Sequence, residues 1–316
     1  PAPSFAAQCR QLTEARAGFD WLAAGSVNVQ QQALRDFAQA MASFFGSGFG
    51  LPAWRRKHRD EGFRITDTCR VEKLNRRWAQ VKVPKVGWVK FRLSRPDLPQ
   101  AKSYRVTYRN GQWHVAFAVI PEPIDAPGNG GVVGVDRGVT VTAALSTGEM
   151  LDCPQLTVKE RARVRKHQRR AARAPRGSDR KAAEYAKVAK LKAREADRRK
   201  DWAEKTSTGL ARRFDVIRFE KLNIGNMTAS AKGTVEAPGR NVRQKAGLNR
   251  AILARGWGML RTRTEEKAFG RVQDVPAPYT SQRCSACGHV DAKSRESQAR
   301  FVCTACGFQC NADVNA

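Results

Sequence analysis

The chain has 316 residues and a formal net charge of +29, from 58 Lys and Arg against 29 Asp and Glu. Hydrophobic residues make up 41% of it, which excludes a disordered basic tail, and it lacks the continuous apolar span of a membrane protein. So large an excess of positive charge repels itself in a compact fold unless a polyanion binds, which makes nucleic acid the first candidate partner and an acidic membrane surface a distant second.

The N-terminal 120 residues change from a helical to a strand-forming pattern. Residues 29–45 carry apolar side chains at helical spacing, which predicts an amphipathic helix packed on a core. Further along, apolar residues alternate with basic or polar ones, and Asn110-Gly111 is a hairpin signal. The alternating segments are 78–83, 88–93, 103–108 and 113–120. They predict a small antiparallel sheet or barrel with one basic, solvated face that suits a phosphate backbone.

A linker rich in proline and glycine, residues 121–131, leads to a second set of predicted strands. Residues 132–136 form a short apolar run that ends at the carboxylate of Asp136. Residues 138–145 then follow as a second apolar run, and a turn at 146–148 leads into a third strand.

Residues 157–213 are predicted to form two helices. Thr157 and Glu160 make a capping box at the start of the first helix, residues 175–177 break it, and Ser178 caps the second. Residues 155–213 hold 21 Lys and Arg against 7 Asp and Glu, a net charge of +14. Such a run is often only a solvated face, but its single sign favours a helical hairpin laid along nucleic acid.

The remaining segments repeat the pattern of a strand that ends in an acid. Residues 214–220 form an apolar run that ends at Glu220. A single helix is expected over residues 249–269, stopped by Gly270, and a further strand over 271–275.

Five of the eight cysteines lie in the last 33 residues, which favours a reducing compartment and a metal site over a disulfide scaffold. Cys284 and Cys287 form one CxxC pair, and Cys303 and Cys306 form a second after fifteen residues. Four thiolates at this spacing predict a structural Zn²⁺ ribbon with no open coordination position. The nearby Cys310 and His289 are interpreted as bystanders.

Three carboxylates are candidate ligands of a second kind of metal. Asp136 and Glu220 end apolar strands, where an unpaired charge is costly, and Asp313 follows the cysteine cluster. Hard oxygen ligands suit Mg²⁺ or Mn²⁺, and a pair of such ions can promote phosphodiester hydrolysis. The residues alone make a metal-dependent nuclease plausible.

Four short motifs resemble the signatures of the TnpB family, transposon-encoded RNA-guided DNA nucleases related to the compact type V CRISPR effectors. The motifs are Val-Gly-Val-Asp136-Arg-Gly-Val, Val-Ile-Arg-Phe-Glu220-Lys-Leu-Asn, Tyr279-Thr-Ser-Gln-Arg-Cys-Ser-Ala-Cys-Gly and Asn311-Ala-Asp313-Val-Asn-Ala. The segment from Phe49 to Phe63, the basic hairpin and the ribbon also occur in the family's order. The resemblance implies that Asp136, Glu220 and Asp313 are catalytic residues that bind Mg²⁺ or Mn²⁺.

The resemblance also implies an α+β multidomain fold. The expected N-terminal lobe, a wedge and recognition lobe, combines helices with a small antiparallel β-barrel. The expected second part is an RNase H-like (RuvC) α/β nuclease domain with an inserted zinc ribbon. The expected bounds are a helical recognition segment at 1–50, the wedge-like barrel at 51–127, the nuclease domain at 128–275 and 311–316 with the basic hairpin 157–213, and the ribbon at 276–310.

The implied function is that of an RNA-guided DNA endonuclease, which cuts double-stranded target DNA next to a short adjacent motif. Guide RNA and target DNA are the expected partners, no membrane is expected, and the oligomeric state, a homodimer included, is left open. We expect a cytoplasmic, nucleoid-associated protein of a bacterium or archaeon. Two alternatives remain: an RNA-guided protein that represses without cutting, and a transposase that recognises element ends without RNA.

Overall fold

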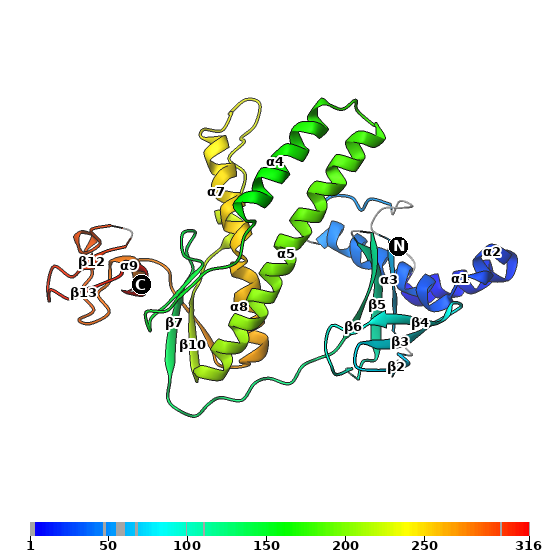
Figure 1. Ribbon diagram of the computed structural model, residues 1–316, viewed down its shortest axis with the longest axis horizontal. Coiled ribbons are helices and arrows are strands. Elements are labelled where there is room, and N and C mark those ends of the chain that lie inside the picture. Colours follow the sequence, from blue (N-terminus) through cyan, green and yellow to red (C-terminus); the bar gives the residue numbers. More distant parts are fainter. Residues whose placement is uncertain are drawn as a thin grey trace. The chain divides into compact units, whose positions relative to one another are not determined.

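The computed structural model describes residues 4–46, 49–54, 61–66, 69–98, 100–109, 111–297 and 299–315. The chain divides into two compact units, Pro1–Ile120 and Pro121–Ala316, drawn from blue to cyan and from green to red in Figure 1. The division falls at the start of the predicted Pro/Gly linker. Within the described residues, no helix has both the length and the apolar character needed to cross a membrane.

The first unit begins with three helices, α1 (Phe5–Gly18), α2 (Asp20–Ala24) and α3 (Val27–Gly46). The hydroxyl of Ser4 caps α1 by accepting a hydrogen bond from the N–H of Ala7. The helix predicted over 29–45 is confirmed as part of α3, which packs against β1 (Gly62–Ile65). Its apolar face is only partly covered, because Phe37 is 40% and Phe45 77% exposed.

Two three-stranded antiparallel sheets complete this unit. One has the order β1-β5-β6, with β5 (Ser103–Arg109) and β6 (Gln112–Ala118), and the other the order β2-β3-β4, with β2 (Val71–Lys73), β3 (Trp78–Val83) and β4 (Gly87–Arg92). Both contribute to one core, which contains Ile65, Val81, Val83 and Tyr104. The hydroxyl of Tyr104 donates to the carbonyl of Lys82 at 2.8 Å and so joins the two sheets. The predicted strands are confirmed; Asn110 of the predicted hairpin turn lies outside the described residues.

The second unit is built on a five-stranded mixed sheet with the order β11-β10-β7-β8-β9. The strands are β7 (Val132–Asp136), β8 (Ala143–Leu145), β9 (Met150–Leu151), β10 (Val216–Glu220) and β11 (Val272–Val275). β7, β10 and β11 run parallel, whereas β8 and β9 continue antiparallel from β7. Their inward side chains form the main core with apolar residues of the long helix that precedes β10.

The basic segment forms the predicted helical hairpin, α4 (Val158–Arg173) and α5 (Asp179–Arg213), which Figure 1 draws in green. The capping box between Thr157 and Glu160 is present, and Ser178 accepts a hydrogen bond from the N–H of Lys181. After β10 come α6 (Ile224–Met227) and two further helices.

The single helix predicted over 249–269 is wrong, because the chain forms α7 (Val242–Arg255) and α8 (Trp257–Lys267) instead. Gly256 between them has a φ of 72°, in the left-handed region that glycine adopts without strain. A Cβ at this position would also lie 2.8 Å from Cδ of Arg199, so the arginine side chain would have to shift.

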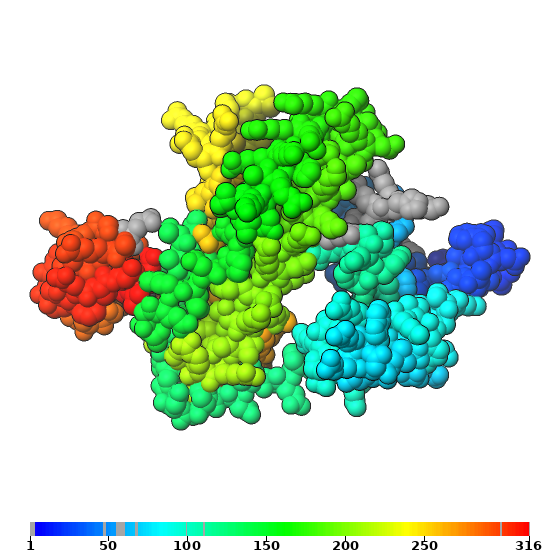
Figure 2. All heavy atoms as spheres, in the orientation of Figure 1, coloured from blue at the N-terminus to red at the C-terminus, as the bar shows by residue number. Residues whose placement is uncertain are grey.

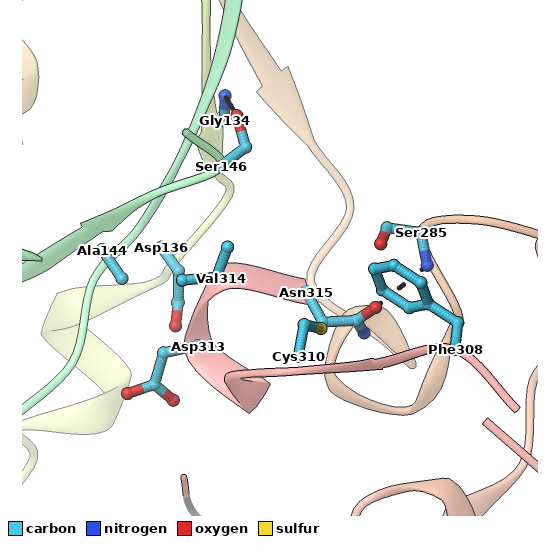
Figure 3. Close-up of a pocket in the computed structure, with 10 residues that line it drawn as sticks. All are labelled: Gly134, Asp136, Ala144, Ser146, Ser285, Phe308, Cys310, Asp313, Val314 and Asn315. Carbon is cyan, nitrogen blue, oxygen red and sulfur yellow. Dashed lines mark hydrogen bonds between the residues drawn. The ribbon is translucent and has the colours of Figure 1, made fainter. Parts of the chain in front are cut away.

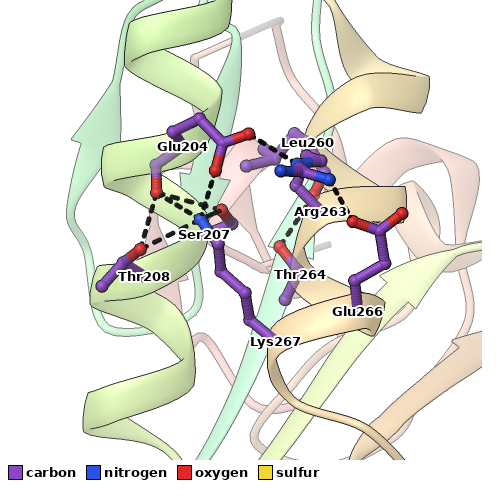
Figure 4. Close-up of polar contacts among 8 residues, drawn as sticks. All are labelled: Glu204, Ser207, Thr208, Leu260, Arg263, Thr264, Glu266 and Lys267. Atoms are coloured by element: carbon purple, nitrogen blue, oxygen red, sulfur yellow. Dashed lines mark hydrogen bonds and ion pairs between the residues drawn. The ribbon is translucent and has the colours of Figure 1, made fainter. Parts of the chain in front are cut away.

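The ammonium group of Lys267 holds α8 against α5, as Figure 4 shows. Its three N–H groups face four oxygens: Nζ lies 2.7 Å from both the carbonyl and the carboxylate of Glu204, 2.8 Å from the hydroxyl of Ser207 and 3.0 Å from that of Thr208. Only 16% of the Lys267 side chain is exposed. The hydrogen bonds therefore satisfy a cation that is largely removed from water.

The C-terminal part of the second unit has little regular structure. It contains two 3₁₀ turns, η1 (Thr280–Gln282) and η2 (Ala292–Ser294), the hairpin β12 (Phe301–Val302) and β13 (Gln309–Cys310), and the short helix α9 (Ala312–Asn315). Its small core consists of Cys284, Phe301, Cys303 and Ala312, with Cys310 beside them. With so few apolar residues, this segment needs a further source of stability.

Candidate functional site

The predicted cysteine ligands lie together. The four sulfurs of Cys284, Cys287, Cys303 and Cys306 are all within 4.8 Å of one another. Sγ of Cys284 is 3.7 Å from that of Cys306, and Sγ of Cys287 is 3.6 Å from that of Cys303. A tetrahedron of sulfurs with Zn–S bonds of about 2.3 Å has edges of about 3.8 Å. The donor set therefore fits a zinc ion, which when bound would supply the stability that the small core lacks.

Two of the predicted carboxylates lie at the ends of neighbouring strands. Asp136 ends β7 and Glu220 ends β10, and the register pairs Val135 with Phe219 one residue earlier. Because the two strands run parallel, their last residues meet at the same edge of the sheet. Apolar side chains on both strands are buried in the core, which fixes the positions of these ends.

The third predicted carboxylate, Asp313, comes from α9 and lies next to Asp136, whose side chain points toward it, as Figure 3 shows. Its N–H donates to Oδ1 of Asn311 at 2.9 Å, and its neighbour Ala312 is fully buried in the ribbon core. Asn315 ties the same helix to the first cysteine pair: its Nδ2 donates to the carbonyl of Arg283 at 2.6 Å. The fold of the ribbon therefore determines where Asp313 lies.

The three carboxylates lie close enough for their negative charges to repel one another. Burial raises the pKa of Asp136 to about 6, and the nearby charges of Glu220 and Asp313 add to that rise. One guanidinium nitrogen of Arg295 in the ribbon lies 3.4 Å from Oδ1 of Asp313. The possible metal-ligand atoms are His nitrogens, Cys sulfurs and carboxylate oxygens. Among the described residues, only the four cysteines bring three or more of these atoms, one from each residue, within 4.8 Å of one another. The acids are thus close enough to interact but more widely spaced than the sulfurs.

Sequence reasoning missed two side chains that hold Glu220. The hydroxyl of Thr280 lies 2.8 Å from Oε1 of Glu220, within hydrogen-bonding distance. The guanidinium of Arg137, which is 5% exposed, donates to the backbone carbonyl of Glu220 and stacks over the ring of Phe219. Both residues belong to the motifs of the sequence analysis, but no periodicity or spacing indicates their role, since the contacts join distant segments.

A cavity of ≈ 190 Å³ adjoins the carboxylates. Asp136 and Asp313 line it together with residues of the sheet and of the ribbon, among them Ser146, Phe308 and Asn315 (Figure 3). It has room for ions, water and a small part of a substrate beside the acids.

The basic hairpin presents its charge to solvent. All eight Lys and Arg residues of α4 are exposed, and none has an ion pair with a described residue. Figure 2 shows the outer surface of α4 and α5 in green. Cations in this state are available to phosphate groups.

Comparisons with known proteins agree with these features. A family model described as a Cas12f1-like TNB domain matches residues 257–316, and one described as a probable transposase matches residues 114–231. The chain is 33% identical over 300 residues to the putative RNA-guided DNA endonuclease InsQ of Escherichia coli K12, covering 93% of this chain and 74% of that one. It is 31% identical over 297 residues to a putative RNA-guided DNA endonuclease of Streptomyces pristinaespiralis, covering 90% and 68%.

Two further matches are to proteins named Cas12f1. A CRISPR-associated endodeoxyribonuclease Cas12f1 of Sulfoacidibacillus thermotolerans is 51% identical over 51 residues, which are 16% of this chain and 12% of that one. The cryo-EM structure of a Cas12f1–sgRNA–target DNA complex has a TM-score of 0.54 at 13% identity, covering 92% of this chain and 69% of that one. That similarity supports the α+β multidomain fold. The long matches at more than 30% identity show that the chain belongs to the TnpB family, which is related to the compact type V CRISPR effectors.

Proposed function

We propose that this protein is an RNA-guided DNA endonuclease, which binds a guide RNA and cuts matching double-stranded DNA next to a short adjacent motif. The observation that carries the proposal is the meeting of Asp136, Glu220 and Asp313 at one edge of a mixed sheet, beside a four-cysteine ribbon. The two relatives that match over most of the chain are named putative RNA-guided DNA endonucleases, which supports the same activity here.

The proposed nuclease domain has an RNase H-like, RuvC-type fold with the zinc ribbon inserted before its last carboxylate. The sheet order supports this: an antiparallel meander of β7, β8 and β9 is extended on the other side by parallel β10 and β11. The two small sheets of the first unit correspond in this proposal to the wedge barrel, and α1–α3 to the recognition segment. The proposed domains have the residue bounds that the sequence predicts.

Asp136, Glu220 and Asp313 are the proposed ligands of catalytic Mg²⁺ or Mn²⁺. The raised pKa of Asp136 supports this assignment, because buried like charges are stabilised by a cation between them. When bound, such ions activate water and stabilise the leaving oxygen of the phosphodiester. The chain's own residues orient the acids: Thr280 and Arg137 hold Glu220, and the ribbon holds Asp313.

The guide RNA and its duplex with DNA bind in this proposal along the basic hairpin. The +14 charge of residues 155–213, with the exposed cations of α4, neutralises phosphates without reading sequence. Guide pairing supplies the specificity. The relatives named above are bacterial, which supports action on DNA in the cytoplasm of a bacterial or archaeal cell.

The test is to purify the protein from cells that carry its natural locus and to sequence any bound RNA. We expect one RNA of defined sequence, and we expect the complex to cut a plasmid that matches it and to spare a mismatched plasmid. If no defined RNA copurifies and the protein acts on element ends, it is a transposase. If RNA binds and the matched plasmid is bound but stays intact with Mg²⁺, the protein is a guided repressor.

A further inference from the structure

The outward face of the sheet β2-β3-β4 combines exposed tryptophans with cations. The inward residues of β3, Ala79, Val81 and Val83, are buried, so the alternate residues point outward. In register, Trp78 lies opposite Arg92, Gln80 opposite Lys90, and Lys82 opposite Trp88. We call these six residues the indole face.

Both tryptophans of the indole face are exposed to solvent. Trp78 is 45% and Trp88 41% exposed, and each has a cation directly across the strand pair. Lys82, Lys90 and Arg92 are all exposed, and none has an ion pair with a described residue. Glu72 on the neighbouring strand β2, opposite Gln80, accepts a hydrogen bond from Gln80 at 2.8 Å. The face therefore offers two aromatic rings and a net positive charge.

Three kinds of partner are distinguishable by this chemistry. An apolar protein surface would use the tryptophans but would bury the three cations without partners, which is costly. The backbone of a duplex would contact the cations but not the indole rings, since the bases of a duplex are stacked inside it. Unpaired nucleotides use both, because their bases stack on aromatic rings while their phosphates meet the cations.

The spacing of the rings fits more than one base. Trp78 and Trp88 lie on adjacent strands and are offset by four residues along them, which places their backbones about 14 Å apart. Gln80 and Lys90 lie between them. Two bases of one strand can therefore stack at the two ends of the face, with the intervening phosphates near the cations in the middle.

We propose that the indole face binds unpaired nucleotides of the guide RNA by stacking two of their bases on Trp78 and Trp88. The guide RNA is the assigned occupant because a single RNA chain has unpaired loops and ends, whereas target DNA arrives with its bases paired. Gln80 also provides an amide that can recognise a ribose 2′-hydroxyl. This inference rests on the proposed function for the identity of the RNA, but not for the stacking itself.

The test measures binding of the full-length protein to three probes: an unstructured RNA of about 12 nucleotides, the DNA strand of the same sequence, and the corresponding RNA duplex. We expect Trp78→Val and Trp88→Val each to weaken binding of the single-stranded RNA by about 5- to 160-fold, the range for loss of one stacked base. Duplex binding should change less than about twofold. The dependence on salt should keep its slope, because tryptophan neutralises no phosphate.

Two further variants are controls. Trp113→Val removes another exposed strand tryptophan, 59% exposed on β6 of the other sheet, and should leave RNA binding unchanged. Lys90→Gln should lower the salt slope by about one and weaken single-stranded and duplex RNA alike.

The proposal is overturned if Trp78→Val and Trp88→Val both bind the single-stranded RNA within about twofold of wild type. It is also overturned if these variants lose as much affinity for the duplex, or if Trp113→Val loses as much affinity for the single-stranded RNA. Equal or tighter binding of the DNA strand, with the same tryptophan dependence, overturns the assignment to guide RNA. Guided cleavage by wild type is scored separately: if cleavage is absent but stacking depends on Trp78 and Trp88, the proposed function fails and the stacking stands.

Discussion

Replacing Asn315 with alanine tests whether the zinc ribbon holds Asp313 in place. The Asn315 side chain is 7% exposed, its Nδ2 donates to the carbonyl of Arg283 at 2.6 Å, and its Oδ1 accepts from the N–H of Ser285 at 3.0 Å. In Asn315→Ala both bonds are lost, and two backbone groups of the first cysteine pair lose their partners. The helix α9, which carries Asp313, is then attached to the ribbon by fewer contacts.

The expected size of the effect follows from these two bonds. Each buried hydrogen bond that leaves a group unsatisfied costs about 1–3 kcal/mol, so the docked position of α9 loses about 2 kcal/mol or more. A loss of about 2 kcal/mol lowers the population of that position by up to about 30-fold. We expect the Mn²⁺ or Mg²⁺ concentration for half-maximal DNA cleavage to rise by up to that factor, while zinc content stays the same.

The assay is cleavage of guide-matched plasmid over a series of metal concentrations, with zinc measured on the same samples and Mn²⁺ binding titrated directly. Thr304→Val is the matched control, because its hydroxyl donates to Asp291 at 2.7 Å, a hydrogen bond within the ribbon that involves no residue of α9. That variant should lower thermal stability without changing the metal dependence. An unchanged metal dependence in Asn315→Ala, with zinc retained, would refute the link between the ribbon and Asp313.

Three further predictions follow from contacts of single side chains. Thr280→Val should raise the metal concentration for half-maximal cleavage, because it removes the hydroxyl next to the carboxylate that ends β10, and Thr280→Ser should return that concentration to the wild-type value. If Thr280→Val and wild type need the same metal concentration, the hydroxyl does not position the carboxylate. In denaturant titrations, Lys267→Met should lower the free energy of unfolding by about 1–3 kcal/mol. The control Lys205→Met removes an exposed ion pair and should change that free energy by less than about 0.5 kcal/mol, so equal losses in the two variants would contradict the prediction. Hydrogen bonds from an arginine of α5 and from the helix cap lower the pKa of Glu160 to about 2, so its stabilising effect is present above the unfolded pKa of about 4.3 and is lost as the pH falls towards 2. Thermal melts of Glu160→Gln should therefore lose less stability than wild type over that range.

The parts of the site that depend on strand ends could be predicted from the sequence. Asp136 and Glu220 each follow an apolar run, and an acid in that position must lie at the edge of a buried sheet. The four cysteines could also be predicted, since zinc fixes both the residue type and the spacing.

Contacts between distant segments could not be predicted. Asp313 is oriented through Ala312 and Asn315, which depend on how the ribbon folds. Thr280 contacts a residue sixty positions earlier, which no local pattern reveals. The break at Gly256 was missed because apolar residues continue at helical spacing on both sides of it, and only the left-handed backbone distinguishes two helices from one.

In the proposed mechanism the three carboxylates hold the metal ions that cut DNA under the direction of a bound RNA. The most direct measurement compares wild type with Asp136→Ala, Glu220→Ala and Asp313→Ala, each purified with its RNA and incubated with matched plasmid and Mg²⁺. We expect wild type to cut only the matched plasmid, and all three variants to keep their RNA, bind the plasmid and leave it intact. Cutting by Asp136→Ala at the rate of wild type would show that this carboxylate is not part of the catalytic site.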